Sequence, residues 1–399
     1  MTLENKLILD SVKGLKDYQV KTRRYLHETP ELSGEEYETS KYLKAECEKL
    51  GLEIHDVEGT GFYAILDTGK EGKTIGLRAD IDGLPVLENE LNLKNKRVCR
   101  SKNEGVFHAC GHDGHMTILL STAKILTENK DKLKGKVIFI FEEGEETGSG
   151  IDAMVEALKK ENIDAIYGNH LFSALDTGKI CISEGPRMAG AAVVDFTVRG
   201  KGGHGSRPDL SISPIFGAAN VLTNLASAWA NQLDVTKTVT LGLGSINGGS
   251  AGNVIPDEVR VTGTFRYFDL EEGAKAVELM KRLGSLTAEA HNCKFIANRI
   301  EEAVSPVMND PELSKFAEKE FAGMLGDSFL ASGTTWFASE SFAKYIKVCP
   351  ILFALVGTRN EELGTGAEHH SEHFDIDEES LYYGTCAMVK MASAFLNDK

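Results

Sequence analysis

The spacing of apolar residues predicts two helices at the start of the chain. Along residues 5–29, apolar positions recur every three or four residues, which is typical of one buried helix face, and Pro30 ends that pattern. Ser33 and Glu36 stand at capping-box spacing, and they predict a second helix over residues 35–50.

Short apolar runs then alternate with longer helical patterns. This alternation predicts an α/β domain with a buried sheet. The predicted strands are residues 62–66, 74–78, 136–141, 165–167 and 351–355, and the predicted helices are residues 113–126, 311–325 and 378–396.

A different order of elements occupies the middle of the chain. Its predicted elements are strands at 193–199, 239–246, 259–268 and 294–301 and helices at 213–232 and 271–290. The order β-α-β-β-α-β is that of a ferredoxin-like module. We therefore expect a discontinuous first domain, residues 1–187 and 304–399, and an inserted second domain, residues 188–303.

Side chains that can bind metal are concentrated between two predicted elements of the first domain. His108 to His115 reads His-Ala-Cys-Gly-His-Asp-Gly-His, which places three histidines, one cysteine and one aspartate within eight positions. Thiolate and imidazole are the usual ligands of zinc and its divalent neighbours. The Cys110-Gly111-His112 spacing suits a turn on which both side chains face one ion.

Two other interpretations of this cluster stay open. The histidines and the cysteine could be buried core residues, although so many polar groups would each need a partner. A thiol-redox role for Cys110 is also possible, but the cluster contains no Cys-x-x-Cys pair.

Further polar residues follow the ends of other predicted strands. Asp80 and Asp82 follow residues 74–78, and a turn rich in carboxylates, residues 142–146, follows residues 136–141. Because ligands collect at the carboxyl ends of strands in α/β domains, we expect these groups to converge. The two aspartates could be ligands, supports of a ligand or turn residues, and support is favoured for Asp82. The acidic turn alone could simply be solvated.

Composition excludes several classes of partner and location. Aspartate and glutamate total 60 residues against 44 lysines and arginines, so the net charge of −16 disfavours nucleic acid and anionic membrane as partners. No segment has the pattern of a signal peptide or a membrane span. Seven cysteines without obvious pairing indicate reduced thiols, as in a cytoplasmic protein.

Taken together, these motifs resemble the di-metal aminoacylase and carboxypeptidase family of amidohydrolases. The similarity is greatest to N-acyl-amino-acid hydrolases, which include hippurate and auxin-conjugate hydrolases. The residues that carry it are 77–85, 108–115, Glu145 and Glu146, 168–170, 202–204, 252–257, His370, Phe374 and Asp375.

The resemblance implies a mixed-sheet, di-metal exopeptidase-like catalytic domain with an inserted ferredoxin-like lid that also forms a homodimer. Two divalent ions (manganese, zinc, cobalt or nickel) would be bound by Cys110, His112, Glu146, His170 and His370. Glu145 would be the general base. The lid residues His204, Asn253 and Arg266 would hold the substrate, often in the partner's site, and Asp82 would support the ligands.

The sequence departs from that family at several points. His369 and His373 are alternatives to His370 as a ligand, and Arg266 could instead form a structural salt bridge. The pattern Gln-Pro-Ala is replaced by Glu142-Glu143-Gly144, and an aspartate is missing from residues 339–342. The stretch 92–100 is also longer than usual.

The expected activity is hydrolysis of the amide bond of N-acyl-amino acids by a metal-activated water. Two ions can polarise the carbonyl and activate water, and Glu145 can move the proton. His204 could donate to the oxyanion, and Arg266 could pair with the substrate carboxylate. The alternatives are a dipeptidase or carboxypeptidase of the same family, a non-catalytic metal- or peptide-binding protein, and a thiol-redox protein.

Overall fold

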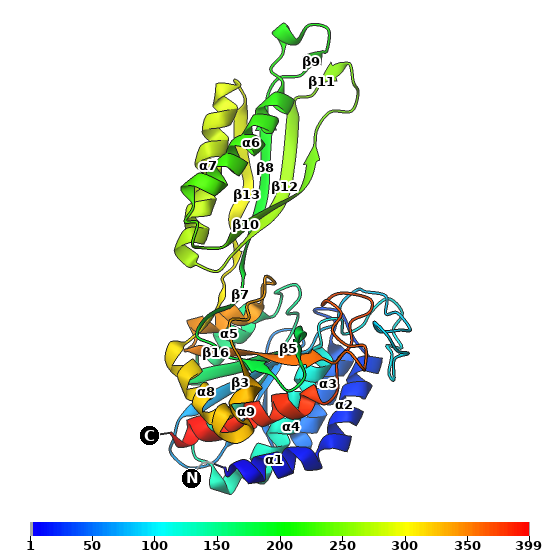
Figure 1. Cartoon of the computed structure of the whole chain (residues 1–399), viewed down its shortest axis with the longest axis vertical. Coiled ribbons are helices and arrows are strands. Elements are labelled where there is room, and N and C mark those ends of the chain that lie inside the picture. Colours follow the sequence, from blue (N-terminus) through cyan, green and yellow to red (C-terminus); the bar gives the residue numbers. More distant parts are fainter. Residues whose placement is uncertain (1–2, 399) are drawn as a thin grey trace. The chain divides into compact units, whose positions relative to one another are not determined.

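The computed structural model describes residues 3–398 and divides into two compact units (Figure 1). Unit 1 comprises Met1–Arg187, Met308–Thr334 and Ser341–Lys399, and unit 2 comprises Met188–Val307 and Thr335–Glu340. Because unit 2 interrupts unit 1 in the sequence, the predicted mixed α/β fold with an inserted domain is confirmed.

An eight-stranded mixed sheet forms the centre of unit 1. Its order is β1 (Glu53–Asp56), β2 (Phe62–Asp67), β4 (Lys136–Glu142), β3 (Thr74–Asp80), β5 (Ala165–Asp176), β16 (Ile351–Arg359), β6 (Ile180–Cys181) and β15 (Leu330–Ala331). β3 runs parallel to both β4 and β5, and β16 runs parallel to β5. The carboxyl ends of these strands therefore meet at one edge of the sheet.

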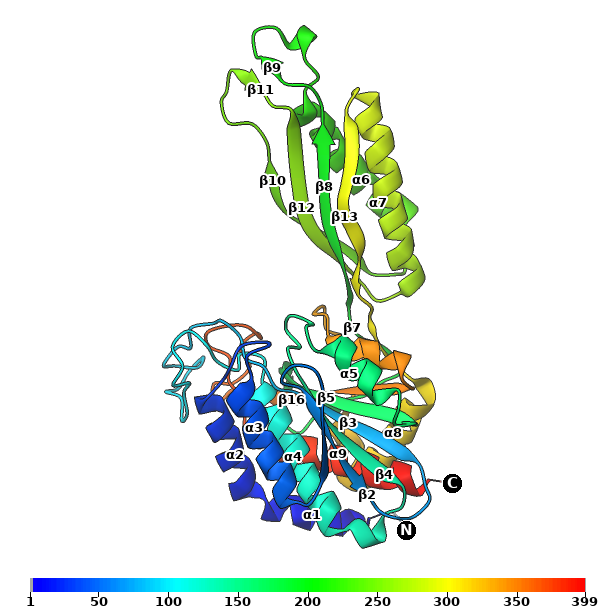
Figure 2. The same cartoon turned by 180° about the vertical axis from the view of Figure 1, so that it is seen from behind.

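Helices cover the sheet of unit 1. α4 (His112–Glu128) and α9 (Ser380–Asn397) pack on one face, together with α1 (Asn5–Gly14), α2 (Lys16–Glu28), α3 (Tyr37–Lys49) and α8 (Pro311–Leu325) (Figure 2). α4 lies between other helices and β3, so it is buried nearly all round, as its continuous apolar sequence requires. On the other face lie α5 (Ile151–Leu158) and the 3₁₀ helix η4 (Ser341–Lys347), whose Phe342 ring lies 4.7 Å from that of Phe353.

Two local predictions at the start of the chain are wrong. Residues 5–29 form two helices, because the chain leaves helical geometry at Leu15 (φ −93°, ψ 4°), directly after the flexible Gly14. The capping box is also absent, since neither Ser33 nor Glu36 caps α3, and Glu31 instead accepts from Glu38 N (3.2 Å) and Thr39 N (2.7 Å) in its first turn. Instead Ser33 Oγ donates to Asp82 Oδ2 (2.7 Å), and Glu36 accepts from Gly144 N (2.9 Å). Tertiary partners thus displaced the local cap.

Unit 2 is the predicted ferredoxin-like module. Its antiparallel sheet has the order β10 (Val239–Asn247), β12 (Glu258–Tyr267), β8 (Gly190–Arg199) and β13 (Lys294–Val304). α6 (Pro214–Gln232) and α7 (Leu270–Ala290) cover one face, and their apolar sides meet Phe196 and Phe265 in a separate core.

Several short elements complete the described chain. They are β7 (Gly185–Met188) paired with β14 (Val307–Asn309), β9 (Gly203–His204) paired with β11 (Val254–Ile255), and the 3₁₀ helices η1 (Lys130–Lys132), η2 (Pro208–Leu210) and η3 (Asp327–Phe329). All seven cysteines lie in the described part and are buried and free of disulfides. Among the described helices, none is both long and apolar enough to span a bilayer.

Candidate metal centre

The centre is built where β3 and β4 end and α4 begins. Gly111 has a left-handed backbone (φ +86°), which a side chain would disfavour, and it turns the chain directly into α4. This turn presents Cys110 and His112 to the same side. β5 runs alongside and contributes His170.

Potential ligand atoms gather here in overlapping groups. Those of Cys110, His112 and His170 all lie within 4.8 Å of one another, and so do those of Cys110, Glu146 and His370. The Cys110 Sγ atom lies 3.5 Å from His170 Nε2. Because Cys110 belongs to both groups, its thiolate could bridge two cations.

Two atoms of this cluster indicate that it is built for a cation. His112 Nε2 and Glu146 Oε1 are buried and 3.8 Å apart, and neither has a hydrogen-bond partner among the described residues. Buried polar atoms are normally hydrogen-bonded, so a buried imidazole nitrogen and a buried carboxylate oxygen without such a bond need an explanation. Thiolate, imidazole and carboxylate donors together suit zinc or a neighbouring divalent metal.

Asp82 contacts the cluster from behind. Its backbone carbonyl and Oδ1 lie 2.9 and 3.1 Å from His112 Nδ1, which directs Nε2 toward the other ligands. Its Oδ2 accepts from Glu146 N (3.1 Å) and Ser33 Oγ. These are contacts across the fold, not within a local turn, and they are typical of a residue that orients metal ligands.

A second support, which the sequence did not reveal, joins β3 to α4. His115 Nδ1 lies 2.6 Å from Asp80 Oδ1, and Arg78 Nη1 donates to Asp80 Oδ2 at 2.8 Å. Leu171 N donates to His115 Nε2 at 2.9 Å, directly beside His170. The alternation of β3, with Arg78 and Asp80 on one face, was the available signal.

The carboxylates give this region a strongly negative field. Burial lowers the pKa of His112, but Asp80, Asp82 and Glu146 raise it overall to about 10. Burial likewise raises the pKa of Asp80, but His112, His115 and Arg78 hold it well below its usual range. A site that stabilises positive charge on an imidazole also attracts a metal cation.

Glu145 lies next to the cluster. Its Oε1 accepts a hydrogen bond from Ser341 N (3.1 Å) at the start of η4. Potential ligand atoms of His112, Glu145 and Glu146 lie within 4.8 Å of one another. The carboxylate is therefore close enough to act on a molecule bound at the cluster.

The three histidines near the end of the chain take different positions. His370 Nε2 lies 3.3 Å from Glu146 Oε1, in the group with Cys110. His369 Nδ1 lies 3.7 Å from Cys110 Sγ, while its Nε2 accepts from Ser173 N. His373 Nδ1 instead lies 3.0 Å from the Leu91 carbonyl, outside the groups found among the described residues. This geometry favours His370 over His373.

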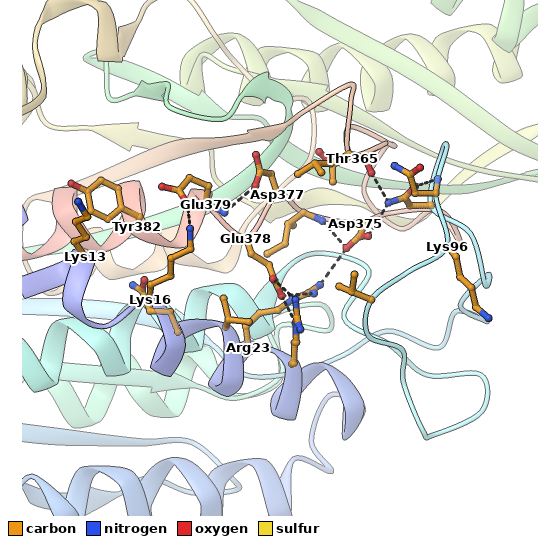
Figure 3. Close-up of a pocket in the computed structure, with 18 residues that line it drawn as sticks. Lys13, Lys16, Arg23, Lys96, Thr365, Asp375, Asp377, Glu378, Glu379 and Tyr382 are labelled. Carbon is orange, nitrogen blue, oxygen red and sulfur yellow. Dashed lines mark hydrogen bonds and ion pairs between the residues drawn. The ribbon is translucent and has the colours of Figure 1, made fainter.

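Behind the first turn of α4 lies a buried network of charges. Asp113 Oδ2 lies 2.8 Å from both Arg23 Nε and His27 Nδ1, and His27 Nε2 lies 2.8 Å from Glu88. Burial and Arg23 lower the pKa of His27, but Asp113 and Glu88 raise it overall. Arg23 also reaches Asp375, five positions after His370 (Figure 3). The network therefore connects α2, α4 and the segment that follows His370.

The same region borders a cavity of about 760 Å³. Figure 3 shows Lys13, Lys16 and Arg23 on one side of it and the Asp375 to Glu379 stretch on the other. None of the five candidate metal ligands is among its described lining residues. The cavity is therefore separate from the candidate centre.

The predicted lid residues all lie in unit 2. His204 and Asn253 are neighbours, because β9 pairs with β11 and Gly205 N donates to the Asn253 carbonyl at 2.8 Å. Both are exposed, and the His204 ring accepts from Ser206 N. Arg266 lies near the other end of β12, eight positions from Glu258, or about 26 Å of strand. Unit 2 thus separates Arg266 from the other two residues.

The alternative role of Arg266, a structural salt bridge, is not seen among the described residues. Its Nη1 donates to Thr264 Oγ1 at 2.6 Å, and it pairs with no carboxylate among the described residues. Burial lowers its pKa. A half-buried guanidinium that pairs with no carboxylate of the described residues could still bind the carboxylate of a ligand.

Comparison with known proteins identifies the family. A model described as peptidase family M20/M25/M40 matches residues 76–394, which includes every candidate ligand. The chain belongs to this family. The predicted resemblance and the assignment as a hydrolase are confirmed.

Relatives along the whole chain support the assignment to the M20 family. IAA-amino acid hydrolase ILR1-like 4 of Arabidopsis thaliana is 35% identical over 384 residues, which cover 95% of this chain and 86% of the relative. Thermostable carboxypeptidase 2 of Saccharolobus solfataricus is 34% identical over 402 residues, covering 100% of both chains. A crystal structure from Bacillus subtilis, described as a dinuclear metal-binding peptidase from the M20 family, matches with a TM-score of 0.83. It is 30% identical and covers 96% of this chain and 99% of that one.

Proposed function

We propose that this M20 hydrolase cleaves the amide bond of N-acyl-amino acids. The observation that carries the proposal is the convergence of five potential ligands, Cys110, His112, Glu146, His170 and His370, beside the Glu145 carboxylate. These residues come from four separate parts of the chain.

The five ligands would hold two divalent cations. When bound, such a pair polarises the scissile carbonyl and lowers the pKa of water. Zinc, manganese, cobalt and nickel all suit the donor set. Asp82 orients His112 through the contacts described above, and it thereby keeps Nε2 available as a ligand atom.

Glu145 is the proposed general base. It takes a proton from the attacking water and returns it to the nitrogen of the departing amine. The hydrogen bond from Ser341 N to Oε1 holds the carboxylate in place beside the cluster. This order of transfers releases a free amino acid and a carboxylate.

Substrate contacts are proposed for three residues of unit 2. His204 would donate to the tetrahedral oxyanion beside Asn253, and Arg266 would bind the substrate carboxylate. Because Arg266 lies about 26 Å of strand from the β9–β11 end of its sheet, one unit 2 does not readily supply all three to one small substrate.

This separation supports a homodimer formed through unit 2, in which His204 and Asn253 serve the partner's site. β10 is an edge strand of its sheet with exposed Leu243 and Ile246, so its outer backbone groups could pair with a second copy. Sedimentation velocity at assay concentration tests this, and a monomer alone would contradict it. We further propose a cytoplasmic location, supported by seven free cysteines.

The decisive experiment is hydrolysis of a panel of N-acyl-amino acids and dipeptides, each with zinc, manganese, cobalt or nickel. Glu145→Gln should keep its metal, measured by elemental analysis, but lose at least about a hundredfold in kcat. The control Glu156→Gln changes an exposed glutamate on α5 and should be fully active. No turnover by metal-loaded protein on any acyl-amino acid or dipeptide would overturn the proposal.

The main alternative is a carboxypeptidase or dipeptidase, which the name of the Saccharolobus relative favours. The discriminating result is a requirement for a free α-amino group on the acyl side of the substrate. Tight product binding without turnover would instead indicate a binding protein. A Cys110→Ser variant that keeps both its metal and its activity would remove the thiolate from the ligand set.

A further inference from the structure

Residues 88–100 form a loop, here named the strap, that contains one buried arginine. The strap exposes its apolar side chains, including Leu93 (59%) and Val98 (71%), yet the Arg97 side chain is 1% exposed. Burying a guanidinium is costly unless its charge and its N–H groups find partners. The burial of the Arg97 side chain therefore requires a structural explanation.

The guanidinium of Arg97 spans two segments that carry candidate ligands. Nη1 donates to the Phe374 carbonyl (2.7 Å) and Nη2 to the Glu372 carbonyl (2.9 Å), four and two positions after His370. The guanidinium also lies 5.7 Å from the centre of the Phe107 ring, three positions before Cys110. Arg97 thus joins the approach to Cys110 with the segment after His370.

Other contacts fix the strap to the same segment. Asn89 N donates to the Glu372 carbonyl (3.1 Å), and His373 Nδ1 lies 3.0 Å from the Leu91 carbonyl. Asn92 Nδ2 donates to Asp375 Oδ2 at 3.1 Å. Lys96, beside Arg97, extends away from Asp375 (Figure 3). The inward direction is therefore specific to Arg97 and not shared by the cations of the strap.

His370 needs such support more than the other candidate ligands. Its backbone is left-handed (φ +63°), which is strained for a residue with a side chain, and its side chain is 50% exposed. The imidazole has little packing of its own, so the surrounding backbone sets its position. One backbone contact comes from Ala109, whose carbonyl accepts from His370 N at 3.0 Å.

We propose that Arg97 is a positioning residue that holds residues 370–374 so that His370 can bind the divalent cation it shares with Cys110 and Glu146. This inference rests on the proposed metal-binding role of His370. Lysine cannot replace Arg97. The planar guanidinium donates to the carbonyls of Asn89, Glu372 and Phe374 from three separate nitrogens, and a single ammonium nitrogen cannot reach all three.

The test measures metal binding directly in metal-free protein. Zinc is titrated into the wild type, Arg97→Gln and Arg97→Lys against a chromophoric chelator, which resolves two sites. One site should weaken by about 10- to 100-fold in both variants, and the other should be unchanged, because His112 and His170 have separate supports. The matched control is Arg100→Gln, since Arg100 is 40% exposed and contacts only the strap itself through Glu88 O and Glu90. It should leave both sites unchanged.

Chemical rescue separates positioning from general stability. Dilute guanidinium should partly restore the weakened site and kcat in Arg97→Ala, with little effect on KM. Equal weakening of both sites together with a lower melting temperature would show a merely structural role and overturn the inference. Wild-type affinity at both sites in Arg97→Gln would also overturn it.

His370→Ala, titrated in parallel, identifies which idea has failed. If it loses one site while Arg97→Gln does not, the role of Arg97 is refuted and the proposed ligand stands. If His370→Ala keeps both sites, then the proposed ligand is wrong, and the inference about Arg97 falls with it.

Discussion

Asp113→Asn should destabilise unit 1 severely, although Asp113 is not a candidate ligand. Its carboxylate is 1% exposed and lies 2.8 Å from both Arg23 Nε and His27 Nδ1. An asparagine carries no charge and offers one acceptor oxygen, so Arg23 and His27 each lose one buried counterion, while Asp375 and Glu88 remain. Breaking a buried ion pair by removing one partner costs about 3–5 kcal/mol.

The matched control is Asp176→Asn, which makes the same chemical change at the surface. Asp176 lies 2.7 Å from Arg359 Nε, but the two side chains are 61% and 42% exposed, so solvent screens the pair. Its loss should cost less than about 1 kcal/mol. Each variant removes the negative charge of a carboxylate that pairs with an arginine, and the two variants differ in how deeply that carboxylate is buried.

Calorimetry of metal-free protein provides the assay, because bound metal would mask the difference. At about 2–4 °C per kcal/mol for a large domain, Asp113→Asn should lower the melting temperature of unit 1 by about 6–20 °C. The control should lower it by no more than about 4 °C. If the two variants melt within about a degree of each other, then the buried network does not support unit 1 and the reasoning is refuted.

Three further predictions address charge, packing and metal. The folded pKa of His27 is raised above its ordinary value of about 6.5, so the stability from its charge is complete below that pH and is lost as the pH rises through the folded pKa. Urea titrations should therefore show the difference in unfolding free energy between wild type and His27→Gln shrinking as the pH rises above about 6.5, and a growing difference would contradict this. Gly284→Ala would place a Cβ 2.4 Å from the Phe295 ring and should destabilise unit 2 by about 1–3 kcal/mol. Gly323→Ala, whose Cβ would have nothing within 4 Å, should stabilise α8 by about 0.5–1 kcal/mol. Equal shifts in melting temperature for the two variants, measured by calorimetry, would refute the packing argument. Chelation of the metal should lower the melting temperature of unit 1 by several degrees, because a cation at a thousandfold excess over its Kd adds about 4 kcal/mol to the free energy of unfolding. Cys110→Ser should reduce that stabilisation by metal.

The periodicity of apolar residues predicted the helices and strands well where an element buries either one face or all of its surface. α8 occupies the predicted residues 311–325, and α6, α7 and the strands of unit 2 begin and end close to their predicted positions. It failed at residues 5–29, where both helices bury the same kind of face and the break at Leu15 leaves the apolar pattern intact. The capping signal at Ser33 failed because a buried aspartate, distant in sequence, was the better partner.

Within the candidate centre, the sequence identified the chemistry and the structure identified the supports. Clustered ligands such as Cys110 and His112 are visible because one short turn carries them. The partners of Asp80 and Arg97 were not visible, since each lies far away along the chain: His115 for Asp80, and the carbonyls after His370 for Arg97. No local pattern records which distant backbone a guanidinium will meet.

The amino-acid sequence alone determined the kind of protein this is, because periodicity and ligand-rich motifs are local properties of the chain. It determined an α/β host, a ferredoxin-like insert and a set of candidate metal ligands. Only the tertiary structure decided that His370 and not His373 faces Glu146, and that the strap folds inward at Arg97. Those choices depend on distances between segments hundreds of residues apart, which are set when the sheet, the helices and the buried charges pack together.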